Sequence, residues 1–177
     1  EMLPRSFDLS MEIARFRGEM ESKLGEPEEK VVQWLMDNFS IDHGSALSLL
    51  HYFKEQQAAA GVPNQRRLLV EGYLDRQGNS GLIFHFPFGR RVNDALSRTY
   101  AFLLTQRMGC NVSVSISDDA FLLVAPKRID LDLIPGLIRS GEMRGVLRRA
   151  VKDSEIFKQR FRHVAARSFM VLRNYKG

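Results

Sequence analysis

The side chains best suited to bind a charged ligand lie in two segments, about seventy residues apart along the chain. The first is His85-Phe86-Pro87-Phe88-Gly89-Arg90-Arg91-Val92, where a strand is expected to give way to a helix. The second runs from Ser154 to Arg167 and carries the candidate cations Lys158, Arg160, His163 and Arg167. Arginine pairs with phosphate through forked, charge-assisted hydrogen bonds. Both segments therefore indicate binding to a phosphate backbone.

The first segment has the composition of a turn that leads into a helix. Proline fixes φ and removes a donor, while glycine permits a sharp turn or the close approach of a ligand. Arg90 and Arg91 add positive charge to a helix N-terminus that is already partly positive, and a bound phosphate would relieve both. Phe86 or Phe88 would stack on an unpaired base, although core packing is the expected fate of at least one of them.

The second segment predicts a helix with an apolar side and basic sides. At about 100° per residue, one side carries the apolar set, which is therefore expected to face the core: Phe157, Phe161, Val164, Ser168 and Leu172. Arg160, His163 and Arg167 lie at i, i+3 and i+7 on another arc, and Lys158 belongs to a second basic row. Such rows contact successive phosphates. The alternative is that some of these arginines bridge to other parts of a larger protein.

Motifs for nucleotide hydrolysis are missing. A phosphate loop needs G-x-x-x-x-G-K-[ST] and a downstream acidic magnesium site. Gly72 and Gly78 form the nearest glycine pair, with no Lys-Ser or Lys-Thr after them, and Asp118-Asp119 is typical of a hairpin turn. We expect that the chain alone does not hydrolyse ATP, and that it holds no catalytic residue and no cofactor.

The cysteine and histidine content predicts neither a disulfide nor a metal. Cys110 is the single cysteine, which suits a reducing cytoplasm, and the four histidines lack zinc-site spacing. The first residues contain no apolar signal region, and no apolar run approaches the roughly 18 to 20 residues of a membrane span. We expect a cytoplasmic protein with no membrane and no small-molecule substrate.

Charge is distributed unevenly along the 177 residues, whose formal net charge is +5. Residues 1–64 carry 6 Lys or Arg and 11 Asp or Glu, a balance of −5, and residues 65–138 carry 9 against 7. Residues 139–177 carry 11 against 3, a balance of +8. A basic end on a nearly neutral body is typical of a surface that binds phosphate backbones, and also of solvated helix faces.

Hydrophobic periodicity divides the chain into a helical part and a mixed part. Helices are expected over about 11–24, 27–39 and 42–60. Strands are then expected at 67–74, 81–86, 111–117 and 121–125, and helices at 91–108, 131–138, 142–151 and 154–173. The predicted fold class is α+β, with a mainly antiparallel sheet of two hairpins packed against helices. The predicted domains are a helical N-terminal segment, 1–64, and an α+β domain, 65–177.

Two features of the helical part have a functional and a structural interpretation. Trp34 lies on an apolar stripe, so contact with a core or another domain is favoured over base stacking. The turn at 39–42 resembles that of a helix-turn-helix motif. Its second helix carries Asp42, Glu55 and only Lys54 as a cation, a poor composition for a reader of the major groove.

Four motifs together resemble those of Lhr-type (large helicase-related) superfamily 2 DNA helicases. Residues 85–92 are similar to the family's H-x-P-F-G-x-R-V, and residues 157–167 to its F-x-x-R-F-R-x-V-A-x-R. Residues 3–9 (LPRSFDL) and 69–71 (LVE) match in the same order. The likeness covers nearly the whole chain and points to the DEAD/H-associated domain that follows the motor and winged-helix domains. It implies a part of a helicase rather than a whole protein.

The resemblance implies a non-catalytic accessory domain of an ATP-dependent 3′–5′ DNA helicase, with a role in DNA repair. Its implied partners are single-stranded DNA or a DNA/RNA hybrid, and the motor and winged-helix domains, which would bind ATP and Mg²⁺. The alternative is a protein-interaction domain that docks on the motor or on a partner protein. The candidate nucleic-acid-binding residues are Phe86, Arg90, Arg91, Arg98, Lys158, Arg160, His163 and Arg167.

Overall fold

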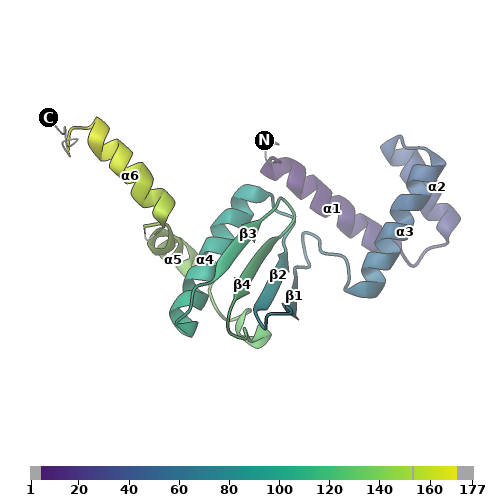
Figure 1. Ribbon diagram of the computed structural model, residues 1–177. Helices are drawn as coiled ribbons and strands as arrows, with labels where there is room; N and C mark the ends of the chain where they lie inside the picture. Colours follow the sequence, from purple (N-terminus) through teal and green to yellow (C-terminus); the bar gives the residue numbers. More distant parts are fainter. Residues whose placement is uncertain (1–4, 153, 171–177) are drawn as a thin grey trace.

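The computed structural model describes residues 5–152 and 154–170 (Figure 1). A helical part comes first, with α1 (Phe7–Lys23), α2 (Glu28–Phe39) and α3 (His43–Ala59). The mixed part follows, with β1 (Leu69–Leu74), β2 (Ser80–His85), α4 (Arg90–Met108), β3 (Ser113–Ile116), β4 (Phe121–Ala125), the short 3-10 helix η1 (Leu131–Leu133), α5 (Ser140–Lys152) and α6 (Glu155–Arg167). The α+β prediction is confirmed.

The four strands form one antiparallel sheet in the order β1-β2-β4-β3. Each predicted hairpin supplies two adjacent strands, and β2 pairs with β4 in the middle, with Phe84 opposite Phe121. Because successive side chains alternate between faces, Leu82, Phe84 and Leu123 share the face that α4 covers. The two hairpins and the long helix therefore enclose one core.

Aromatic packing dominates that core. The rings of Phe84 and Phe121 stack at a centroid distance of 4.4 Å, and Phe86 meets each of them edge-on at 5.5 Å. Tyr100 from α4 lies 5.1 Å from Phe84. The Phe84 side chain is thus enclosed between its strand neighbours and α4.

The helical part has a core of its own. Met20 of α1, Leu35 of α2, and Leu50 and Phe53 of α3 are buried together with Val62 of the linker to β1. Side chains cap two of the helices, because Ser6 Oγ accepts a hydrogen bond from Leu9 N, and Asp42 Oδ1 accepts one from Ser45 N. The two buried clusters lie on either side of the linker, residues 60–68.

Helix α1 contacts both parts of the molecule, as Figure 1 shows. Just before the helix, Arg5 donates from Nη2 to Asp119 Oδ1 at 2.5 Å and from its backbone N to Asp118 Oδ1 at 3.3 Å, both in the β3–β4 turn. Near its other end, Glu21 accepts a hydrogen bond from Asn64 of the linker. The helix therefore joins the two cores.

Gly89, at the start of α4, is required by this arrangement. It has a φ of 86°, and a Cβ built there would lie 2.9 Å from Ser10 Oγ of α1. We expect Gly89→Ala to lower the free energy of unfolding by about 2–3 kcal/mol, because a strained φ costs about 1–3 kcal/mol and the new methyl group also displaces α1. Urea denaturation measures the loss. Gly109→Ala, at a φ of 62° with open space around it, is the control for backbone strain without a clash.

Two predicted features of the C-terminal half are wrong. The helix expected at 131–138 is only the turn of η1, because Pro135 removes a backbone donor and Gly136 disfavours helix. The apolar side of α6 does not face the core. Phe157, Phe161 and Val164 are exposed, and α6 projects away from the sheet at the opposite end of the molecule from α2 and α3 (Figure 1). Leu172 lies outside the described residues.

Candidate nucleic-acid interface

The start of α4 already has an anion at its N-terminus. Asp118 Oδ1, from the β3–β4 turn, accepts a hydrogen bond from Arg90 N at 3.2 Å, and Gly89 N donates to the Asp118 carbonyl oxygen at 2.9 Å. A carboxylate therefore occupies the place for which the sequence predicted a phosphate. The guanidinium groups of Arg90 and Arg91 are exposed beside it, so contacts to phosphate at this turn would come from side chains rather than from the helix N-terminus.

Phe86 does not have the position that base stacking requires. Its side chain is only 6% exposed and packs against Phe84 and Phe121. Phe88 is half-buried, 6.2 Å from Phe86 between ring centroids. Phe86 is therefore a core residue and not a stacking residue, because a base has no access to a ring face enclosed by the sheet and α4.

A groove between α4, α5 and α6 brings two predicted arginines together. It encloses about 350 Å³, and its lining residues are Asp94, Ala95, Arg98, Leu147, Val151, Ser154, Phe157 and Arg160. Arg98 is oriented by Asp94, whose Oδ1 accepts from Arg98 Nε at 2.8 Å. Arg91 lies two turns before Arg98 on α4. The groove thus has an apolar floor with guanidinium groups on both sides.

The remaining predicted residues lie on α6 and are exposed. Lys158 donates from Nζ to Glu155 Oε1 at 2.8 Å, and this hydrogen bond and charge lower the pKa of Glu155. Arg160, His163 and Arg167 have no carboxylate partner within the described residues. Arg98 on α4 is half-buried, whereas the other predicted cations are exposed. We call these cations of α4 and α6 the basic surface: Arg90, Arg91, Arg98, Lys158, Arg160, His163 and Arg167.

Exposed aromatic rings accompany the basic surface, and sequence reasoning missed them. The rings of Phe157 and Phe161 stack on one another at 6.2 Å, and both are exposed on α6. Helical periodicity had predicted them to be buried. An apolar stripe that packs in the core and an apolar stripe that binds another molecule have the same spacing, so periodicity does not distinguish them. Next to the basic residues, they offer faces on which bases stack.

Tyr73 is another exposed aromatic residue that the sequence did not single out. It lies on β1 opposite Gly81 of β2, and its ring covers the Gly81 backbone so closely that any side chain at Gly81 would collide with it. On the same face, Glu71 and His85 pair at 2.9 Å. The only advance signal was a glycine within a strand, which marks a close approach by another group.

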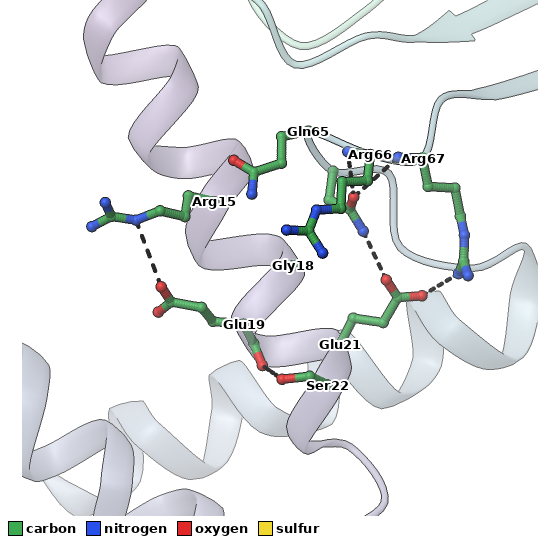
Figure 2. A pocket seen from close by; sticks show the side chains of 9 residues that line it. Arg15, Gly18, Glu19, Glu21, Ser22, Gln65, Arg66 and Arg67 are labelled. Atoms are coloured by element: carbon green, nitrogen blue, oxygen red, sulfur yellow. Dashed lines mark hydrogen bonds and ion pairs between the residues drawn. The ribbon is translucent and has the colours of Figure 1, made fainter.

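A polar pocket of about 580 Å³ lies between α1 and the linker, far along the chain from the basic surface (Figure 2). We call it the linker pocket, and its lining residues are Arg15, Gly18, Glu19, Glu21, Ser22, Asn64, Gln65, Arg66 and Arg67. Sequence reasoning missed it, because its two walls are about 45 residues apart and neither contains a recognisable motif.

Three further expectations from the sequence concern Trp34, a metal site and a membrane span. Trp34 is half-buried in the helical part, where Lys23 Nζ lies 4.8 Å from its ring centroid. Among residues 5–152 and 154–170, no group of three or more His, Cys, Asp or Glu side chains is arranged to hold a metal ion. Within the same ranges, no helix combines the length and apolarity needed to cross a membrane.

Comparison with known proteins identifies the class to which this fold and surface belong. Residues 62–177 match the model of the DEAD/H associated family, and the chain belongs to that family. The resemblance to Lhr-type helicases is confirmed by relatives along its whole length. The chain is 41% identical to ATP-dependent helicase Lhr-Core protein 2 of Thermococcus barophilus and 39% identical to ATP-dependent helicase Lhr-Core of Methanothermobacter thermautotrophicus.

The chain matches only one part of each of these relatives. Both alignments cover 100% of this chain but only 20% and 21% of the relatives, so it spans about a fifth of their length. A structure of the helicase Lhr from Mycobacterium smegmatis, bound to ssDNA and AMP-PNP, superposes with a TM-score of 0.75 at 26% identity. That match covers 99% of this chain and 22% of the other.

Proposed function

We propose that this chain is a non-catalytic accessory domain of an Lhr-like ATP-dependent 3′–5′ helicase and contacts the tracking strand through the basic surface. The observation that carries the proposal is the groove between α4 and α6, which Arg98 and Arg160 line together with the exposed Phe157. Guanidinium groups pair with phosphates, and an exposed ring stacks on bases without regard to sequence. ATP and Mg²⁺ would bind elsewhere in the polypeptide.

The relatives support this choice of partner. The superposed Mycobacterium smegmatis helicase was bound to ssDNA, and a strand carries the two features that the basic surface matches, regular negative charge and unpaired bases. These features support single-stranded DNA, or the strand tracked in a DNA/RNA hybrid, as the proposed partner.

The test is the binding of a fluorescently labelled single-stranded oligonucleotide, followed by anisotropy at several salt concentrations. For Arg91→Ala/Arg160→Ala/Arg167→Ala, we expect the slope of log K against log salt to become shallower by about 2, because each lost phosphate contact removes about 0.7. Affinity at low salt should fall on the order of tenfold to a hundredfold, with each lost contact contributing about 0.5–1 kcal/mol.

The matched control removes the same charge elsewhere. Arg76, Arg107 and Arg128 are exposed residues in the β1–β2 turn, at the end of α4 and after β4. Arg76→Ala/Arg107→Ala/Arg128→Ala should retain most of the wild-type slope. Equal losses in both triple variants would mean that only net charge matters, and the assignment to the basic surface would be wrong.

A second candidate function is protein docking, and the exposed apolar stripe of α6 favours it. The stripe consists of Phe157, Phe161 and Val164, and an amphipathic helix such as α6 can bury a stripe of this kind against another domain. In this second function, α6 would pack against the motor domains. The oligonucleotide titration separates the two functions, since phosphate contacts weaken log-linearly with salt and apolar docking does not. Undetectable strand binding at low salt would favour docking.

A further inference from the structure

The linker pocket has features of a binding site that the proposed function does not use. Its volume, about 580 Å³, lies within the range of about 300–1,000 Å³ that small-molecule and cofactor sites occupy. One wall is α1, and the other is the turn of the linker at residues 64–67 (Figure 2). A ligand in the pocket would therefore contact both α1 and the linker that leads into β1.

The turn that forms one wall is held in a single geometry. Asn64 is only 4% exposed, and its Oδ1 accepts hydrogen bonds from Arg66 N at 2.8 Å and Arg67 N at 3.0 Å. Its Nδ2 donates to Glu21 Oε2 at 2.7 Å. The guanidinium group of Arg67 pairs with the other oxygen of Glu21. The backbone on both sides of Arg66 is therefore fixed before any ligand arrives.

The same contacts leave the pocket with an excess of positive charge. Both oxygens of Glu21 have partners, and Glu19 lies 3.6 Å from the Arg15 guanidinium group. Arg66 has no acceptor for its guanidinium group among the described residues. Figure 2 shows this group directed from the linker toward the part of α1 around Gly18. Gly18 has no side chain, and a Cβ there would lie 3.8 Å from the Asn64 side chain, so at this point of the pocket α1 contributes only backbone.

The lining also indicates which part of a ligand would be recognised. None of the nine residues is aromatic or a large apolar residue, so the pocket offers no face on which a base could stack. It offers the Arg66 guanidinium group and the Gln65 amide, which suit phosphate oxygens and sugar hydroxyls, whereas Arg15 already pairs with Glu12 at 2.9 Å and Glu19 at 3.6 Å. Contacts of this kind hold a strand in position without reading its sequence.

We propose that the linker pocket binds a backbone phosphate of the nucleic-acid strand, with Arg66 as the principal contact. This inference rests on the proposed function, which supplies the strand as the partner. The pocket would be a second place of contact with the strand, separate from the basic surface. The shared chemistry of the ligand is a phosphate group, from a strand or from a free anion.

Two measurements on the 177-residue chain test the proposal. Arg66→Ala should make the salt slope of oligonucleotide binding shallower by about 0.7, the value for one phosphate contact with a single strand. Arg76→Ala removes one exposed arginine outside the pocket and should leave the slope unchanged. In amide NMR spectra, the oligonucleotide should shift the backbone amides of Gln65, Arg66 and Arg67.

The outcomes are distinct from those for the basic surface, because the variants share no residue. An unchanged slope for Arg66→Ala, or amides of residues 65–67 that stay in place, overturns the pocket as a strand site. Shifts produced equally by inorganic phosphate at the same phosphate concentration identify a free-anion site, and overturn the strand as the ligand. The proposed function fails separately, if the triple variant of the basic surface binds like the wild type.

Discussion

Phe84→Ala should lower the free energy of unfolding by about 3–5 kcal/mol, the usual cost of removing a buried phenyl ring and leaving a cavity. Phe84 is 0% exposed and lies on the second of four strands, in ring contact with Phe86, Tyr100 and Phe121. Sheet neighbours on both sides and α4 above leave little freedom to close the cavity. Urea denaturation followed by circular dichroism measures the loss.

The control for Phe84 is a phenylalanine of the same size outside the core. Phe161, on α6, is 56% exposed, and Phe161→Ala should change stability by less than about 1 kcal/mol because little apolar area returns to water. The two variants also separate stability from binding, since Phe161→Ala should weaken strand binding if its ring stacks on a base. Equal destabilisation by both variants would contradict the assignment of Phe161 to an exposed face.

Asn93→Asp should destabilise the protein by about 4 kcal/mol near neutral pH. Asn93 is 0% exposed, and its Nδ2 donates to the carbonyl oxygens of Phe86, Ser117 and Asp118 at 2.9–3.2 Å. A carboxylate there would face these carbonyl oxygens without a donor, and an uncompensated buried charge costs about 3–5 kcal/mol. Asn93→Ala, which removes the donor without adding charge, should cost about 2 kcal/mol.

The pH dependence of Asn93→Asp distinguishes charge from shape. Burial among carbonyl oxygens would raise the pKa of the new carboxyl group in the folded state above its unfolded value. The folded state then binds the proton more tightly, so the variant should recover stability as the pH falls through the folded pKa toward the unfolded one. Denaturation at several pH values measures this recovery relative to Asn93→Ala. A constant difference between the two variants would contradict the buried-charge explanation.

Local patterns predicted most of the elements. Alternating residues and turn signals placed both hairpins, and the apolar spacing of 91–108 matches α4 within one residue. These signals are local: a strand alternates, a helix repeats every 3.6 residues, and glycine or proline ends both. The helix expected at 131–138 failed where Pro135 and Gly136 outweighed a short apolar run. The motifs around His85 and Arg160 were sufficient for the resemblance to Lhr-type helicases.

By itself, the sequence determined the α+β class, the hairpins, the family and the basic C-terminal third of this protein. The tertiary structure alone decided which of the chosen side chains are accessible. It buried Phe86 and exposed Phe157, and it put Asp118 at the start of α4. It also brought Glu21 and Arg66 to one pocket. The physical reason is that periodicity records which side of an element is apolar, whereas exposure and long-range pairing depend on how distant elements pack together.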